Sequence, residues 1–271
     1  TQGYSSAASD VYKRQLYDIE GDDGSRSETM SLGMLRQAAA SGTTHIFATP
    51  HMHRHEVVPS WSSIEERVAE LQQKADAEGI PITIHTGAEV SLDYDTLQYL
   101  PGGENTDYCL GGTHYLLVEL TPQSEPEMVS KLFYELQLRG YILILAHPER
   151  YHRIMRHPET VFRWMQDGLL TQSNVGSFDG LFGEDAQKNV ENLYRHHMIC
   201  FLGSDGHRTD WRNPDTRKAH EAIDRFTGSG EFWETCSRNA EMILKNRVFY
   251  PKIPDAYEMK KKGFFARLFG K

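Results

Sequence analysis

The sequence predicts an α/β barrel, and three observations indicate this fold class. Short apolar runs alternate with helical segments along most of the chain, as in proteins built around a parallel sheet. The apolar runs are continuous rather than alternating with polar residues, so both of their faces are expected to be covered. The 271 residues, 39% of them hydrophobic, can bury a sizeable core, and barrels of this length often form one domain.

Helical periodicity and apolar runs place the individual elements. Helices are expected at 28–40, 62–78, 125–139, 158–167 and 184–197. Strands are expected at 44–48, 82–90, 115–120, 141–146, 169–174 and 199–204. Gly42 and Gly79 follow the first two helices, where glycine commonly ends a helix. Six strands leave the barrel short of its opening strand, which we interpret as lost or replaced.

The two ends of the chain differ from residues 16–250, which we assign to the barrel. Residues 1–15 are rich in serine and alanine, and their DVYKRQ is also encoded by a common sequencing-library adaptor. We expect this segment to be non-native, and a genuine disordered tail is the alternative. Residues 251–271 form a basic, aromatic tail ending in KKKGFFARLFGK. A solvated or partner-docked tail is favoured over weak contact with an anionic membrane surface.

Composition excludes several classes of function. The net charge of −9 and the pI near 5.8 argue against a nucleic-acid binder. The three cysteines are widely spaced and favour a reduced, cytoplasmic setting; they are Cys109, Cys200 and Cys236. No cysteine lies in the Cys-x5-Arg loop of a thiol phosphatase. No apolar run approaches the roughly 18 to 20 residues that span a membrane.

Metal-binding residue types recur at the carboxyl ends of five of the six predicted strands. These side chains are His51, Glu89, Glu119, His147, Asp205 and His207. One such residue is usually solvated or satisfied by a neighbour, but five strands ending this way are hard to explain by chance. Imidazole and carboxylate without thiolate suit Mn, Fe or Zn. The pattern therefore predicts a cluster of ions that generates hydroxide and hydrolyses a phosphoester.

Two arginines follow the ligand-bearing loops. Arg150 lies in AHPER and Arg212 in SDGHRTDWRNP. The planar guanidinium matches phosphate oxygens in a bidentate way, so both are candidates for substrate binding and catalysis. A surface salt bridge is the alternative for either one.

Five short motifs in order carry a resemblance to a known family. They are TPH at 49–51, GAEV at 87–90, VEL at 118–120, HPER at 147–150 and SDGH at 204–207. The chain resembles, over about 22–250, the bacterial manganese-dependent protein-tyrosine phosphatases of capsule and exopolysaccharide synthesis, which belong to the polymerase-and-histidinol-phosphatase superfamily. The resemblance implies a distorted, seven-stranded barrel of the TIM type that binds up to three ions, with Mn²⁺ the expected metal.

The resemblance also implies roles for individual residues. Glu89 would bridge two ions, Glu119 and His147 would complete one of them, and Asp205 would hold the other. Asp23, with His51 and His207, would hold the third ion. Arg150 and Arg212 would grip the phosphate. The implied substrate is phosphotyrosine in the tail of a bacterial tyrosine autokinase; the oligomeric state stays open.

The chain departs from this family at its start. The family opens with a strand ending in His-x-His, but the same offset from Asp23 falls here on Arg14 and Leu16. The ion held by Asp205 is therefore expected to bind weakly or not at all. Two alternatives follow: another phosphoesterase of the superfamily, such as a histidinol phosphatase, or a catalytically impaired phosphopeptide-binding protein.

Other histidines support weaker interpretations. His53 and His55 lie just past His51 and could line the rim near the substrate, although solvated loop residues are favoured. His45 and His85 lie inside predicted strands and are expected to be structural.

Overall fold

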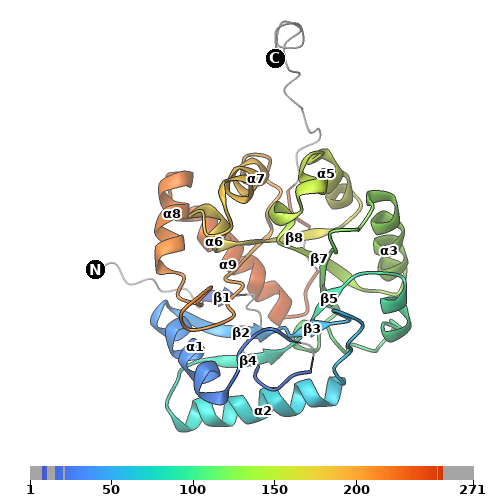
Figure 1. Cartoon of the computed structure of the whole chain (residues 1–271). Helices are drawn as coiled ribbons and strands as arrows, with labels where there is room; N and C mark the ends of the chain where they lie inside the picture. Colours follow the sequence, from blue (N-terminus) through green and yellow to red (C-terminus); the bar gives the residue numbers. More distant parts are fainter. Residues whose placement is uncertain (1–7, 11–15, 21, 249, 253–271) are drawn as a thin grey trace, which may run out of the picture.

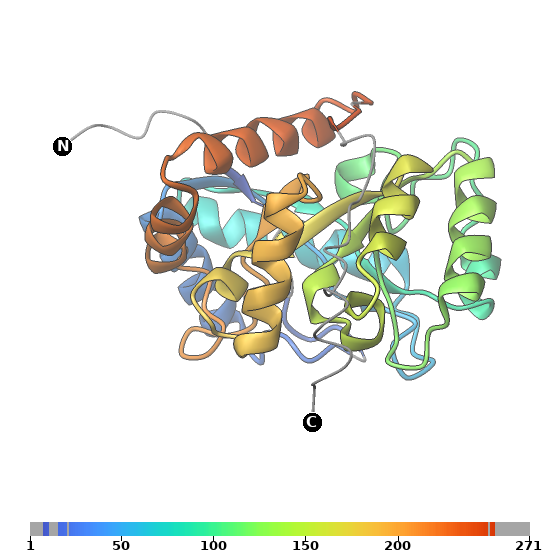
Figure 2. The same cartoon turned by 90° about the horizontal axis from the view of Figure 1, so that it is seen from above.

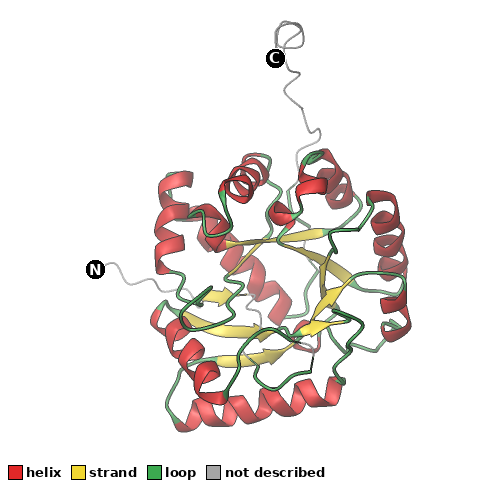
Figure 3. Ribbon diagram, in the orientation of Figure 1, coloured by secondary structure: helices red, strands yellow, loops and turns green. Residues whose placement is uncertain are grey.

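The computed structural model describes residues 8–10, 16–20, 22–248 and 250–252. Within these residues the strands form a ring that helices surround (Figures 1 and 3). All of the pairings between the named strands are parallel. The α/β barrel predicted from the sequence is therefore confirmed.

The described strands are short and the described helices longer. The strands are β1 Ala8–Asp10, β2 Thr43–Ala48, β3 His51–Met52, β4 Thr83–Thr86, β5 Glu89–Ser91, β6 Tyr115–Glu119, β7 Ile142–Ala146, β8 Leu170–Asn174 and β9 Phe201–Gly203. The helices are α1 Glu28–Ala40, α2 Trp61–Ala77, α3 Pro126–Leu138, α4 His152–Met155, α5 Glu159–Gln166, α6 Val175–Phe178, α7 Glu184–Arg195, α8 Arg217–Thr227 and α9 Glu231–Leu244. Three 3₁₀ turns lie at Asp95–Tyr99, Leu110–Gly112 and Pro148–Arg150.

Two strands of the barrel are interrupted where they approach the site. The sheet orders are β1-β2-β4 and β3-β5-β6-β7-β8-β9, and β3 and β5 continue β2 and β4 after two residues each. When each interrupted pair is counted as one strand, the nine described strands correspond to a seven-stranded barrel. A Cβ on Gly87 would lie 2.9 Å from a methyl carbon of Leu110, so glycine permits the close approach at one interruption. The predicted strand 82–90 is thus two strands.

A short strand, β1, lies at the edge of the sheet beside β2. β1 pairs in parallel with β2, and its residues lie within the segment 1–15 that the sequence analysis assigned to a non-native or disordered region. Disorder does not describe Ala8–Asp10, because backbone pairing with β2 places them in the sheet. Residues 1–7 and 11–15 lie outside the described residues, as do residues 253–271 of the predicted tail.

The first two long helices follow the predicted pattern closely. α1 has the predicted bounds, and the hydroxyl of Ser27 accepts a hydrogen bond from the backbone N–H of Met30 at 3.2 Å. Ser60 caps α2 in the same way by accepting from Ser63 N–H. α8 and α9 were not predicted from the sequence. No helix within the described ranges is both long and apolar enough to cross a membrane.

α9 covers the end of the barrel where the strands begin. It contacts β1 and β9, and the side-chain amide of Asn239 donates to the carbonyl of Cys200 at 2.9 Å. The buried face of α9 consists of Cys236, Ser237, Ala240 and Ile243. Figure 2 shows α9 as the long red helix along one side of the molecule. The opposite end, where the strands finish, is left for the polar side chains described below.

His45 and His85 form a pair on neighbouring strands β2 and β4. Their rings stack with centroids 5.3 Å apart, and His45 Nδ1 lies 3.1 Å from His85 Nε2. Burial, and secondly the His45 ring, lower the pKa of His85 from 6.5 to about 4. The neutral ring of His85 is therefore the form that the fold accommodates.

We expect His85 to make the fold sensitive to acid. Because its pKa is lower in the folded state, the unfolded chain binds more protons between about pH 6.5 and pH 4. This contribution to stability is complete above about pH 6.5 and is lost as the pH falls towards about 4. His85→Gln should flatten the dependence of the unfolding free energy on pH, measured by urea titration across this window. His157→Gln, at an exposed histidine, is the control, and a slope in His85→Gln equal to that of the parent would contradict the assignment.

Candidate active site

Four of the predicted ligands converge from four neighbouring strands. His51, Glu89 and Glu119 each offer a ligand atom, and these atoms lie within 4.8 Å of one another. His51 Nδ1 lies 3.0 Å from Glu119 Oε1, and His147 Nε2 lies 3.1 Å from Glu89 Oε1. The parallel register of β3, β5, β6 and β7 brings these strand ends to one edge. His147 has a left-handed backbone conformation, with φ 37°, directly after β7.

The charges of this group are strongly linked. Burial and the nearby Glu89 raise the pKa of Glu119, but the hydrogen-bonded His51 ring and His147 outweigh them and hold this pKa below its usual value. Ser91 also donates to Glu119 Oε1 at 2.6 Å. The Glu89 side chain is fully buried and that of Glu119 is 16% exposed. Buried carboxylates flanked by imidazoles are a donor set that suits a divalent cation.

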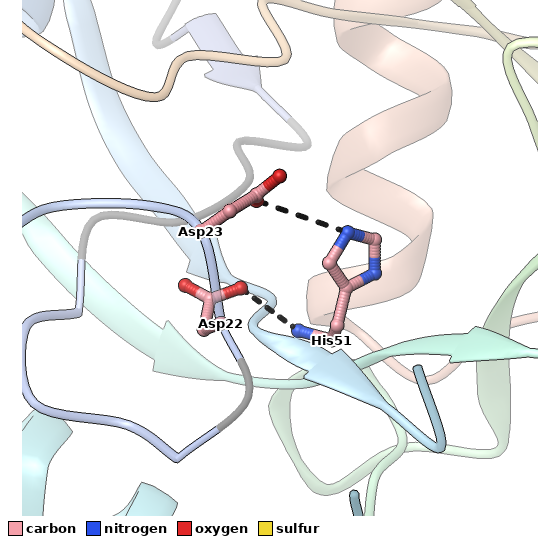
Figure 4. A group of neighbouring side chains, drawn as sticks. All are labelled: Asp22, Asp23 and His51. Atoms are coloured by element: carbon pink, nitrogen blue, oxygen red, sulfur yellow. Dashed lines mark hydrogen bonds and ion pairs between the residues drawn. The ribbon is translucent and has the colours of Figure 1, made fainter. Parts of the chain in front are cut away.

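A second group of three donors consists of Asp22, Asp23 and His51 (Figure 4). Asp22 Oδ1 accepts a hydrogen bond from the backbone N–H of His51 at 3.2 Å. Asp23 Oδ1 lies 4.0 Å from His51 Nε2 and 3.9 Å from His207 Nε2. The structure thus brings together the predicted set of Asp23, His51 and His207. Asp22 was not predicted, although it is the first aspartate of the same Asp-Asp-Gly motif.

Arg54 is a further residue that the sequence analysis missed. Its Nη1 lies 2.8 Å from Asp23 Oδ2 and 2.6 Å from His51 Nε2. A guanidinium therefore neutralises part of the acidic charge at this second group. Its signal in the sequence is weak, because one arginine in a histidine-rich loop has no distinctive spacing.

Asp205 lies apart from these two groups and is bound by cationic and amide donors. Its Oδ2 accepts from Arg150 Nη1 at 3.0 Å, from Asn174 Nδ2 at 2.7 Å and from Arg212 Nη2. The backbone at Asp205 is left-handed, with φ 52°. His207 Nδ1 lies 3.7 Å from Asp205 Oδ1. Both predicted phosphate-binding arginines thus contact a predicted metal ligand.

Neither of the two positions that match the family's His-x-His carries a histidine. Leu16 is 1% exposed and packs into the apolar core, where it offers no donor atom. Arg14 lies outside the described residues.

A cavity of about 460 Å³ opens onto the predicted metal and phosphate-binding residues. Asp23, Glu119, His147, Arg150 and Arg212 line it, together with His53, Arg54, His55, Ser91, Asp93 and the segment 120–123. The His53 side chain is 9% exposed and lies 3.3 Å from Asp93 Oδ2, so the interpretation of His53 as a solvated loop residue was wrong. His55 is exposed, as that interpretation expected.

The fold and the site define a class of protein: an α/β barrel whose strand ends carry carboxylates and imidazoles suited to metal-dependent hydrolysis. The chain belongs to the capsular polysaccharide synthesis family CpsB/CapC, whose model matches residues 18–245.

Curated relatives and solved structures agree with this family. The chain is 30% identical to tyrosine-protein phosphatase YwqE of Bacillus subtilis (strain 168), over 90% of this chain and 95% of YwqE. It is similar to a solved structure from work on YwqE of Bacillus subtilis and CpsB of Streptococcus pneumoniae, described as unique metal-dependent tyrosine phosphatases. That match has a TM-score of 0.83 and 28% identity, and covers 92% of this chain and 99% of the other. Histidinol phosphate phosphatase of Lactococcus lactis shares the fold, with a TM-score of 0.52 and 13% identity over 82% of this chain and 94% of its own.

The three cysteines are buried and free, which makes them poor nucleophiles. Burial, and secondly Asp107, raise the pKa of Cys109 to about 12. Burial raises the pKa of Cys200 to about 11 and, together with Cys200, raises that of Cys236 well above its usual value.

We therefore expect the native protein to resist alkylation of its thiols. Iodoacetamide at about pH 8 should leave all three cysteines unmodified, because burial blocks access and the thiolate fraction is small. Intact-mass measurement checks this, and the urea-unfolded chain, which should be fully alkylated, is the control. Alkylation of any of the three cysteines in the folded chain would contradict the interpretation of these thiols as buried and unreactive.

Proposed function

We propose that this chain is a metal-dependent protein-tyrosine phosphatase that acts in the cytoplasm on a bacterial tyrosine autokinase controlling capsule or exopolysaccharide synthesis. The substrate is phosphotyrosine in the tail of that kinase. The observation that carries the proposal is the buried set of carboxylates and imidazoles that opens, with two arginines, onto one cavity. Family membership supports the choice of substrate.

The donor set fits divalent cations. Glu89, Glu119 and His147, with His51 beside them, would hold one ion, and Asp23, with His51 and His207, would hold another. Asp22 adds a further carboxylate to the second set. Oxygen and imidazole donors suit Mn²⁺, and also Fe or Zn. Ions bound there activate water for attack on phosphorus and neutralise charge on the phosphoryl group.

The arginines would orient the substrate. Arg150 and Arg212 line the cavity and carry planar donor forks that match phosphate oxygens. Both now donate to Asp205, so binding a phosphate requires their donors to be shared between this carboxylate and the substrate. Metal held by these residues would supply an activated water as the nucleophile, so the proposed reaction would need no nucleophilic side chain.

Of the three ions in the family, the one assigned to Asp205 is the least well supported by this chain. Asp205 would hold it with the two histidines of His-x-His, and their positions fall on Arg14 and Leu16. Leu16 is buried in the core, and Asp205 is engaged by two guanidinium groups and an amide. We infer that the ion of the Glu89 group and the ion of the Asp23 group bind readily, and that the ion of Asp205 binds weakly or not at all.

This departure favours one second candidate: a phosphopeptide-binding protein that docks the kinase tail with little hydrolysis. Manganese-dependent hydrolysis of a phosphotyrosyl peptide by the chain as it stands separates the candidates. Turnover that exceeds the rate with histidinol phosphate supports the tyrosine phosphatase. Tight peptide binding without turnover supports the second candidate, and a preference for histidinol phosphate would indicate another phosphoesterase of the superfamily.

We expect individual ligands to be essential once a His-x-His segment is restored ahead of Asp22. Asp205→Asn or His147→Ala should then lower turnover by at least about 100-fold, because even residues that only support metal ligands contribute about 10-fold to 100-fold. Metal content measured on the same samples should fall with His147→Ala. Asp185→Asn and His157→Ala, at exposed residues, are the matched controls. Rates in either ligand variant close to those of the parent would refute the ligand assignment.

A further inference from the structure

The ring of Phe182 lies against both of the arginines that open onto the cavity. The guanidinium carbon of Arg150 is 4.7 Å from the ring centroid, and that of Arg212 is 5.0 Å from it. Both distances fall within the range of a cation–π contact, which is about 6 Å. Phe182 itself is half-buried and does not belong to either donor group. One aromatic ring therefore serves two cations that come from different loops.

The loop between α6 and α7 holds this ring in place. The backbone N–H of Leu181 donates to the carbonyl of Gly176 at 2.9 Å, and that of Gly183 donates to Gly180 at 3.0 Å. A Cβ on Gly176 would lie 2.8 Å from Leu181 Cδ2 and 3.2 Å from Phe182 Cε2. Gly176 therefore leaves the space into which Leu181 and Phe182 pack. Packing at Gly176 thus restricts where the ring of Phe182 can lie.

The two arginines need such a support because their charges are alike. Arg150 and Arg212 both donate to the same oxygen of Asp205, so two guanidinium groups converge on one carboxylate. The three side chains together carry a net charge of +1, and the two guanidinium groups repel each other at this short separation. The electron-rich face of an aromatic ring attracts cations and restricts where a guanidinium lies. Arg212 also lies 5.3 Å from the ring of Trp211, whereas Arg150 packs on the ring of Phe182.

The two arginines differ in how much conformational freedom the contact with Phe182 has to restrict. The Arg150 side chain is 33% exposed, and that of Arg212 is 8% exposed. A long, partly exposed side chain loses considerable conformational freedom when it binds a ligand, unless it is already held in place. Phe182 therefore has its larger effect on Arg150, which it keeps beside Asp205 and at the wall of the cavity.

We propose that Phe182 is a positioning residue that holds Arg150 and Arg212 ready to bind the phosphate of the substrate. The identity of the substrate in this proposal rests on the proposed function. The test does not, because phosphate binding can be measured without turnover. Phe182 acts through the arginines and contacts no reacting atom.

The test is the binding of inorganic phosphate to the full chain in the presence of Mn²⁺, measured by calorimetry. Phe182→Leu keeps an apolar side chain but removes the aromatic face, so phosphate should bind about fivefold to thirtyfold more weakly. Phe182→Tyr keeps the face and should bind within about twofold of the parent. If the leucine variant unfolds, Phe182→Met takes its place and should weaken phosphate binding in the same way. With a phosphotyrosyl peptide, the KM should rise more than kcat falls.

Phe226→Leu is the matched control, because Phe226 makes the same kind of contact with Arg195, at 5.2 Å, away from the cavity. It should leave phosphate binding unchanged. Phosphate binding by Phe182→Leu and Phe182→Met within twofold of the parent overturns the proposal, as does a parent chain that binds no phosphate. Equal weakening in Phe182→Tyr and Phe182→Leu also overturns it, because packing alone would then explain the effect. Binding without turnover in the parent leaves this proposal standing and counts against the phosphatase.

Discussion

The burial of two carboxylates side by side is the constraint on which the site depends. Glu89 begins β5 and Glu119 ends the neighbouring strand β6, and both side chains are largely withdrawn from water. Neither can stay ionised there without nearby positive charge or hydrogen-bond donors. The imidazoles of His51 and His147 lie within 3.1 Å of one carboxylate each. The left-handed turn at His147 and the interruptions after β2 and β4 are the local departures from regular strand geometry that accompany this arrangement.

The second consequence is an uneven distribution of charge along the cavity. At one end, carboxylates outnumber cations around His51, which favours divalent metal. At the other end, Arg150 and Arg212 share the single carboxylate of Asp205, which leaves an excess of positive charge. A phosphate monoester placed between them would meet cations on both sides once metal is bound.

The sequence predicts the parts of this protein that depend on local pattern. The bounds of α1 and the order of β2, β4, β6, β7, β8 and β9 follow from periodicity and apolar runs, whereas β3 and the separation of β5 from β4 were not predicted. α8 was missed because its buried stripe is only Ala219 and Ile223. Asp22 was missed because its contact with His51 spans 29 residues of sequence. Asn174 was missed because its contact with Asp205 spans 31 residues. Such contacts depend on how the barrel closes, which no short window of sequence records.

The start of the chain shows why the fold and the chemistry respond differently to the same change. β1 pairs with β2 through backbone groups, which nearly every residue type carries, so many different sequences can complete a sheet edge. Metal binding needs particular side chains at particular positions, and backbone pairing cannot supply them. The barrel, the Glu89 group and the Asp23 group are all formed with β1 beside β2. The missing histidines would supply donors beside Asp205, whose Oδ2 accepts from two arginines and Asn174. We therefore propose that the absence of His-x-His affects one metal position and not the fold.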